Sequence, residues 1–418
     1  MMKRRALLLG FSFFATLSLS PMTIASEESP LGLVDHATQT EPSLPRTLGL
    51  TLDRYYSPAV GSELVLSLLH TVQTLEDRTL QQTQNDTSLQ PVLSRIGQFA
   101  IEGLLWNTAT TAQHEIFGHG FRAREFHMPV HYRINIGGGG RIRFPVANYN
   151  QLSYHERAAF NAGGMEGNSR LAKNLRDQWL NHSHIDMREA HVYLNASLDQ
   201  TLYMRDTFKK DKNAIASGHD VAGYIAEVNA WHGAPVLTND KLKRRALLDL
   251  LDPYLFYSLY GIGHYLHDGT QSFEYPMINL GNYQYLPALR VVPAPYGIEY
   301  QWMNFVKGPD YDIQAGLRAG KTGTLASHAL DLEINRLFSS DLLFVDLKTS
   351  LWRQPKLFTA SAATTKEHMG AALSMVTRYR MTQSVEFSGQ AGYKTTGYMP
   401  GEILKHSPIL RVGFKAFL

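Results

Sequence analysis

Two histidines and a glutamate lie close together in the segment from His114 to His119, which reads HEIFGH. Neutral imidazole nitrogens bind zinc, and a neighbouring glutamate such as Glu115 can take a proton from the attacking water. The common HExxH motif spaces its histidines at i and i+4, on one helical face. The spacing here is i, i+5, which turns the second ring about 140° away on an ideal helix. A π-helical turn would bring both rings back to one face, and Gly118 offers it little steric resistance.

The segment 110–126 resembles the HExxGH zinc motif of the dipeptidyl peptidase III family, which carries the same additional residue. The residues after His119, GFRAREF, are also similar to the continuation of HExGH-type membrane zinc proteases. The resemblance implies a zinc-dependent hydrolase, with His114 and His119 as ligands, Glu115 as general base and peptide bonds as substrate. The alternative is that these side chains make ordinary hydrogen bonds on a helix surface.

A catalytic zinc site needs a third protein ligand, and Glu166 is the predicted one. Glu166 follows His114 at a distance similar to that of the ligating glutamate in the dipeptidyl peptidase III family, and flanking glycines would allow close backbone approach. The family's glutamate-rich second motif is absent, so a glutamate exposed in a turn is the alternative. His219 and Asp220 are candidates for orienting a metal ligand by a hydrogen bond, without binding the metal themselves.

Two other groups of residues could bind the metal, but each also has a structural explanation. Glu156 fits a capping box with Ser153 at a helix start. His264 and His267, spaced i, i+3, could meet a metal, lie beside the membrane interface or cap carbonyl groups at a helix end. The chain has no cysteine, so only histidines and carboxylates are available for Zn²⁺.

The N-terminus has the pattern of an exported protein. Residues 1–25 combine a basic start, a short apolar core and a small residue at a cleavage point, which predicts a signal peptide. Residues 26–48 are polar and contain proline, which predicts a flexible leader. The net charge of +3 is small for 418 residues and gives no indication of nucleic acid as a partner.

Residues 49–275 are predicted to form a mainly helical, zincin-like domain. Its expected helices cover 57–85, 92–126, 153–180, 188–211, 214–231 and 240–267. The stretch containing Leu93, Ile101, Leu104 and Trp106 is apolar on most sides, which predicts a buried helix leading to the site. A β-hairpin is expected from His131 to Phe144 around four glycines. It would either pair with an extended peptide substrate or form a simple surface hairpin.

From 283 to 418 the hydrophobic period changes to two. Eight alternating segments are expected, beginning near Tyr283, Tyr296, Tyr311, Leu330, Leu343, Ala371, Val385 and Leu410. Charged residues fill many of the intervening positions, so that Val345 faces one side and Asp346 the other. An antiparallel membrane barrel has this pattern, with apolar residues on lipid and charged pairs inside. A soluble β-domain packed on the helices is the alternative.

The complete prediction is an α+β chain: a helical domain followed by an eight-stranded β-barrel. The terminal strand resembles that of Gram-negative outer-membrane proteins, although it ends on Leu418 rather than an aromatic residue. The resemblances imply an outer-membrane zinc metallopeptidase with its helical domain in the periplasm, and polypeptide substrate, outer-membrane lipid and the barrel assembly machinery as partners. Two alternatives remain. One is a non-enzymatic outer-membrane protein whose helical domain binds a partner or assists envelope assembly; the other is a zinc hydrolase acting on lipid or peptidoglycan.

Overall fold

The computed structural model describes residues 46–80, 87–206 and 219–418, which belong to one compact unit. The predicted signal peptide, and all but the last residues of the predicted leader, lie outside the described residues, as do parts of the helices predicted for 57–85, 188–211 and 214–231. The expected boundary between residues 275 and 283 does not separate two compact units. Helical and strand residues instead share one core, in which Trp179 and Tyr254 accompany Leu286 and Phe305.

The helices occupy most of residues 58–268, close to the predicted ranges. They are α1 (Pro58–Leu80), α2 (Leu89–Ala112), η2 (Gln113–His119), α3 (Gly120–Glu125), α4 (Val146–Gln151), α5 (Tyr154–His182), α6 (Met187–Asp206), α7 (Asp220–His232), α8 (Asn239–Ala246), η3 (Leu247–Leu251) and α9 (Pro253–Asp268). The helix predicted for 240–267 is divided, because Asp252 caps a new helix whose first residue is Pro253. No helix in these described ranges has both the length and the apolar character needed to cross a membrane.

One expectation for α2 is wrong. Trp106 is buried, but Leu93, Ile101 and Leu104 are 56%, 71% and 52% exposed. A single-sequence pattern cannot distinguish an apolar face that packs on protein from one that faces outward, because both have the same period.

The strands form one large sheet and two small ones. The large sheet has ten antiparallel strands in the order β1-β14-β13-β12-β11-β10-β9-β8-β7-β6. Their bounds are β1 (Thr47–Leu52), β6 (Ile278–Leu280), β7 (Tyr283–Ala294), β8 (Gly297–Lys307), β9 (Asp312–Thr322), β10 (Leu325–Ser339), β11 (Leu343–Pro355), β12 (Glu367–Thr382), β13 (Val385–Lys394) and β14 (Ser407–Phe417). The eight strands predicted beyond residue 283 are therefore confirmed. Two short pairs, β2 (His131–Ile134) with β3 (Gly140–Arg143) and β4 (His184–Asp186) with β5 (Ser272–Glu274), are the other strands of the described residues.

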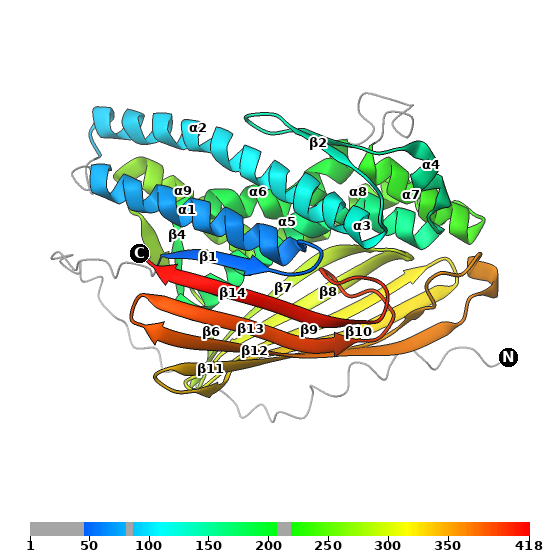
Figure 1. Ribbon diagram of the computed structural model, residues 1–418. Helices are drawn as coiled ribbons and strands as arrows, with labels where there is room; N and C mark the ends of the chain where they lie inside the picture. Colours follow the sequence, from blue (N-terminus) through cyan, green and yellow to red (C-terminus); the bar gives the residue numbers. More distant parts are fainter. Residues whose placement is uncertain (1–45, 81–86, 207–218) are drawn as a thin grey trace, which may run out of the picture. The chain divides into compact units, whose positions relative to one another are not determined.

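The sheet includes a strand that the sequence pattern did not reveal. Strand β1 begins within the predicted leader and pairs with β14 at the other end of the chain, so that Thr47 is opposite Phe417. The described strands do not close into a ring, since β1 and β6 lie at the two ends of the order. Figure 1 shows the helices along one side of this sheet, with α1 beside β1.

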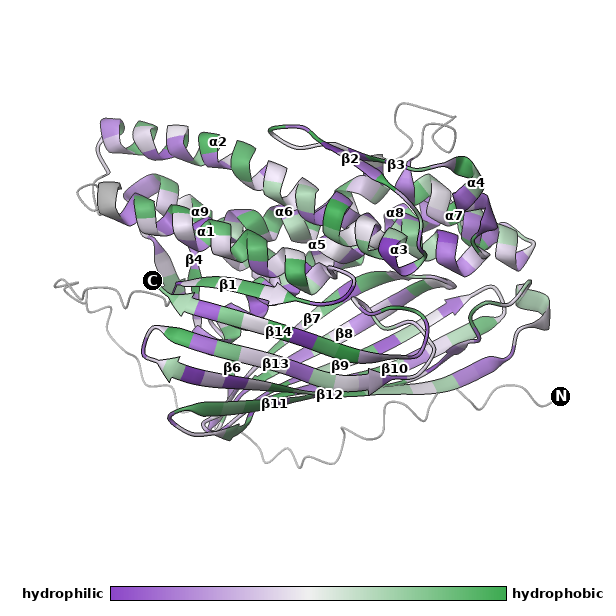
Figure 2. Cartoon of the chain, viewed as in Figure 1, coloured by the Kyte–Doolittle hydropathy of each residue, from purple (hydrophilic) through white to green (hydrophobic). Residues whose placement is uncertain are grey.

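The two faces of the large sheet differ in polarity, as predicted. Figure 2 shows hydrophilic and hydrophobic residues alternating along the strands. On β11 the Asp346 side chain is buried and accepts a hydrogen bond from Arg378. One cavity of about 160 Å³ is lined by α5 and by residues from each of β7 to β14, which shows that the sheet curves around it. The residues that the strands contribute include Val291, Gln301, Gln314, Asp331, Lys348, Ser374, Gln390 and Arg411.

Candidate metal centre

The histidines of the HEIFGH segment lie on a π-helical turn between α2 and α3. This turn, η2, covers Gln113–His119, so the structure contains the distortion that the i, i+5 spacing predicts. His114 is 8% exposed and His119 only 1% exposed. The two rings meet edge to face with centroids 5.0 Å apart, and both point into the same site.

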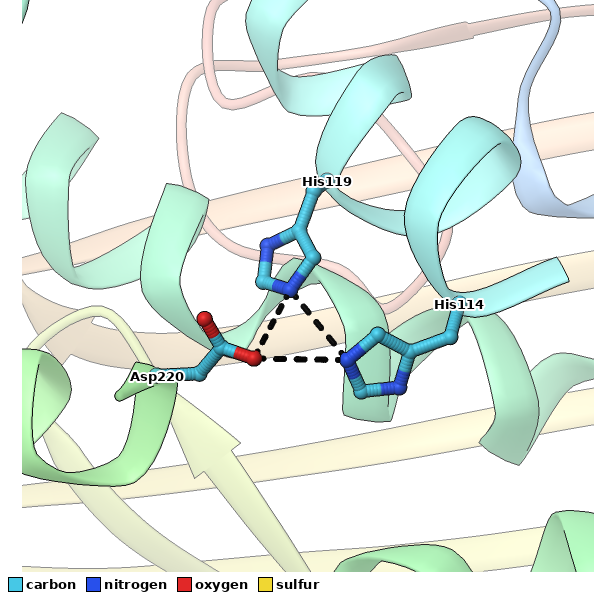
Figure 3. A group of neighbouring side chains, drawn as sticks. All are labelled: His114, His119 and Asp220. Atoms are coloured by element: carbon cyan, nitrogen blue, oxygen red, sulfur yellow. Dashed lines mark hydrogen bonds and ion pairs between the residues drawn. The ribbon is translucent and has the colours of Figure 1, made fainter. Parts of the chain in front are cut away.

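A carboxylate from a distant helix joins the two imidazoles. Asp220, the first residue of α7, places Oδ2 3.1 Å from His119 Nε2 and 3.3 Å from His114 Nε2. The two Nε2 atoms are 3.2 Å apart. Figure 3 shows the two histidines of η2 and Asp220 of α7 pointing toward one another.

The dimensions of this triangle fit a tetrahedral zinc ion. Zinc binds nitrogen and carboxylate oxygen at about 2.0–2.1 Å, which places neighbouring tetrahedral ligands roughly 3.3 Å apart. The three observed separations, 3.1, 3.2 and 3.3 Å, are close to that value. Three protein ligands also leave a fourth position open for water or substrate, as catalytic zinc sites do.

Hydrogen bonds to neighbouring groups hold the candidate ligands in place. His114 Nδ1 lies 3.1 Å from Asp199 Oδ2, and His119 Nδ1 donates to the carbonyl oxygen of Phe160 at 2.7 Å. Each bond puts the proton on Nδ1 and leaves Nε2 free to bind a metal. The Tyr203 hydroxyl donates to Asp220 Oδ2 at 3.1 Å.

Glu115 lies in the cleft beside the triangle. Its side chain is 7% exposed and lines the same cleft as His114 and Asp220. The backbone of Gly140 packs directly on it: a Cβ atom at that position would lie 2.6 Å from Glu115 Oε1. The predicted hairpin, β2–β3, therefore supports Glu115 from one side of the cleft.

Glycines of α5 allow that helix to approach the π-helical turn. A Cβ atom on Gly164 would lie 2.1 Å from His114 Nε2, in the space that the imidazole of this candidate ligand occupies. A Cβ atom on Gly118 would meet the carbonyl oxygen of Gly163 at 2.4 Å. The close approach expected from these glycines is thus present, and it positions His114.

The charges of the site follow from this packing. Burial lowers the pKa of His114, but Asp199 and Asp220 outweigh it and raise that pKa. Burial also lowers the pKa of His119, but Asp220 outweighs it and raises that pKa too. Burial raises the pKa of Asp220, but the two histidines outweigh it and lower that pKa below the ordinary value. Burial also raises the pKa of Glu115, because its neighbouring histidines offset desolvation only in part. An anionic Asp220 between two imidazoles is a suitable ligand set for a divalent cation.

The site opens into a cleft of about 550 Å³ between α2, α6 and the hairpin. Leu194, Leu198 and Leu202 form an apolar wall from α6. The opposite side is polar and contains Thr111 and the hairpin backbone at Gly138–Gly140. The hairpin tip is held against α2, because the backbone N–H groups of Gly137 and Gly139 donate to the hydroxyls of Thr108 and Thr111.

The structure does not bring Glu166 to the histidines. Both of its carboxylate oxygens accept hydrogen bonds from Arg122, at 2.7 Å and 3.0 Å, and Gly401 N donates a further one at 2.7 Å. Glu166 lines the cavity inside the sheet and not the cleft. The carboxylate that lies beside the two histidines is therefore that of Asp220 and not that of Glu166.

The remaining candidates have structural roles. Glu156 accepts a hydrogen bond from the backbone of Ser153, so the predicted capping box is present. His264 lies 3.3 Å from Asp268 on α9. His219 stacks on the Tyr203 ring, with centroids 4.4 Å apart, and does not belong to the ligand triangle.

Sequence reasoning misses the parts of the site that come from distant helices. Nothing in the sequence pattern singles out Asp199, and the pattern places Asp220 in the surroundings of a ligand rather than on the metal. Asp220 is 106 residues from His114, and no local spacing connects the two. One signal is present: a carboxylate at the start of a helix, directly after His219, in a chain without cysteine ligands.

Comparisons with known proteins add little. No protein-family model matches the chain, and no curated protein matches it. A solved structure described as a NanC porin in a rhombohedral crystal form is similar over 34% of this chain and 75% of that chain, with 14% identity and a TM-score of 0.25. A likeness of this size carries no functional information.

Proposed function

We propose that the protein is a zinc-dependent hydrolase whose ligands are His114, His119 and Asp220. The observation that carries this proposal is the triangle of ligand atoms, 3.1 to 3.3 Å apart, beside the buried Glu115 in an open cleft. A two-histidine, one-carboxylate set also suits iron(II) oxygenases. The adjacent glutamate favours hydrolysis, since hydrolysis needs a general base next to the attacking water.

The residues divide the chemistry among them. Zinc, when bound, supplies a Lewis acid and lowers the pKa of water. Glu115 takes the proton of the attacking water and passes it to the leaving group. Asp199 and the Phe160 carbonyl hold the two imidazoles in the tautomer that leaves Nε2 free.

The substrate that we propose is a peptide bond. The HExxGH resemblance supports this choice, as does the position of the β2–β3 hairpin, whose tip at Gly138–Gly140 borders the cleft. Hydrolysis of lipid or peptidoglycan is the alternative within the same chemistry. A non-enzymatic role in partner binding or envelope assembly is the alternative outside it.

We also propose an outer-membrane location, reached through the barrel assembly machinery. Its support is the large sheet, whose outward side chains are largely apolar and whose inward side chains are mostly polar or charged, as in membrane barrels. Outward residues such as Leu317, Leu373 and Val412 are 50%, 57% and 64% exposed. The helices share a core with this sheet, so we do not propose a separate periplasmic domain for them.

Metal analysis of the purified, detergent-solubilised protein tests the function. We expect about one zinc ion per chain, lost in His114→Ala, His119→Ala and Asp220→Asn, because each removes one of three ligands. His219→Ala is the matched control: it neighbours Asp220 in the chain but lies outside the triangle, so zinc should remain. Zinc retained in all three ligand variants, or iron in place of zinc, would contradict the proposal.

A further inference from the structure

Strand β1, at one edge of the large sheet, is covered by side chains of α1. Ser67 Oγ accepts a hydrogen bond from Gly49 N and donates one to Gly49 O, both at 2.7 Å. Thr47 N donates to His70 Nδ1 at 3.1 Å. The backbone edge of the sheet is therefore satisfied by a helix at these positions and not by another strand.

Strand β7, near the other edge, is covered in the same way. Short strand β6 pairs only with its first residues, Tyr283–Tyr285. Farther along, Val291 N donates to Asp249 at 2.7 Å and Val291 O accepts from Gln200 at 2.7 Å. The Tyr224 hydroxyl donates to Ala294 O at 2.8 Å. Helices thus close the opening that the ten strands leave.

A bilayer does not tolerate a bare sheet edge, because lipid offers no hydrogen bonds to unpaired backbone groups. If the sheet lies in a membrane, the helices that satisfy its edges must lie at the same depth. The polarity of the outward faces of these helices then indicates whether lipid or water surrounds them.

The outward faces of α1 and η3, which satisfy sheet edges, are apolar, as are those of α2 and α9 in the same layer of helices. The exposed side chains include Leu64 and Leu68 on α1, Leu93, Ile96, Ile101 and Leu104 on α2, Leu247, Leu250 and Leu251 on η3, and Phe256, Leu259 and Tyr260 on α9. By contrast, α8 exposes Asp240, Lys241 and Arg244, as a helix facing water does. The exposed apolar surface of the sheet therefore continues across both edges onto α1, η3 and α9.

The stripe on α2 also has a suitable length. From Leu89 to Leu104 the helix rises roughly 22 Å at 1.5 Å per residue, similar to the apolar band of about 25 Å on outer-membrane barrels. No charged residue of α2 is exposed over this stretch: Arg95 and Glu102 are both buried. Helix α2 packs on α9 and runs in the direction of the strands (Figure 1).

We propose that the bilayer contacts α1, α2, η3 and α9 as well as the sheet, so that helices complete the lipid-facing wall of an incomplete barrel. This inference rests on the outer-membrane location proposed above. In this arrangement the helices are embedded in the membrane together with the sheet. The metal cleft, whose residues begin at Asn107 one turn beyond Leu104, then lies near the edge of the apolar band.

Spin labelling tests this surface, and the absence of native cysteine makes single labels specific. Nitroxides are attached at Leu68→Cys, Ile96→Cys and Leu259→Cys in the full-length protein in phospholipid vesicles. Leu373→Cys on β12 and Lys241→Cys on α8 are references for lipid and water. At the three helix positions we expect access of a nickel chelate to fall roughly tenfold or more below that at Lys241, with high oxygen access, because polar solutes are excluded from hydrocarbon.

The references separate failure of this inference from failure of the proposed location. Nickel access at the helix positions equal to that at Lys241, with Leu373 protected, would overturn the helical wall and leave the membrane location intact. Nickel access at Leu373 as well would overturn both. Protection of the helix positions from both nickel and oxygen would mean that another polypeptide covers them, which also overturns the inference.

Discussion

At the scale of single residues, the site depends on a carboxylate that no local motif contains. The HEIFGH segment identifies His114, Glu115 and His119, but the geometry replaces Glu166 with Asp220 as the third candidate ligand. Glu166 instead neutralises Arg122, a fully buried guanidinium. The two glutamates, Glu115 and Glu166, therefore have separate roles, and substitution distinguishes them.

Glu115→Gln should retain zinc and lose hydrolysis, because the amide has nearly the same volume but cannot accept a proton from water. We expect kcat/KM on an unstructured protein substrate to fall by about 100-fold or more. Zinc content and proteolysis are measured on the same preparation. Unchanged activity would favour the non-enzymatic alternative, whereas joint loss of zinc and activity would make Glu115 a ligand.

Glu166→Gln should also retain zinc, but it should lower the stability of the protein. It leaves Arg122 without its bidentate partner in a buried position, which costs about 3 kcal/mol of unfolding free energy. Zinc stoichiometry should not change, since neither Glu166 oxygen belongs to the triangle. Thermal unfolding and metal content are the two measurements. A stable variant without zinc would restore Glu166 as a ligand.

At the scale of elements, helix packing around the π-helical turn determines the site. The sequence predicts that turn from the i, i+5 spacing and the presence of Gly118, because both are local features. It also predicts that glycines near residue 164 allow close approach. The partner of Gly164 was not predictable, since α5 and η2 come together only through tertiary packing.

Gly164→Ala should therefore remove zinc without unfolding the protein. The added methyl group would lie 2.1 Å from His114 Nε2, so the imidazole must move out of the triangle. Gly97→Ala is a matched control within a helix, because a Cβ atom added there would meet no atom within 4 Å. The control should retain zinc and gain about 0.5–1 kcal/mol of stability from helix propensity. Full zinc content in Gly164→Ala would show that the π-helical turn adapts.

At the scale of the whole molecule, alternating residues predict the eight strands of 283–418 but not how the sheet ends. Strand β1 carries the same alternation, with Leu48, Leu50 and Leu52 exposed, yet it is short and precedes a helical region. Its partner β14 lies at the other end of the chain, and a local period contains no information on so distant a pairing. The hydrogen bonds between helices and both sheet edges could not be predicted from the sequence for the same reason.

The contact between Asp249 and strand β7 gives the last prediction. Asp249 is 1% exposed and accepts hydrogen bonds from Val291 N, Gln200 and Thr201, at 2.7, 3.0 and 2.9 Å. Asp249→Ala leaves these buried donors unpaired and should lower the unfolding free energy by about 3 kcal/mol. Asp240→Ala, an exposed aspartate on α8, should change it by less than about 0.5 kcal/mol.

Hydrogen exchange at the Val291 amide separates loss of this edge contact from general destabilisation. In Asp249→Ala that amide should exchange much faster, while amides in the β11–β12 pair, far from either edge, keep their protection. A strand edge without a hydrogen-bonding partner cannot persist in lipid, so under the proposed outer-membrane location the variant should also be recovered from that membrane in reduced yield. Unchanged protection at Val291 would show that the helices do not hold this edge of the sheet.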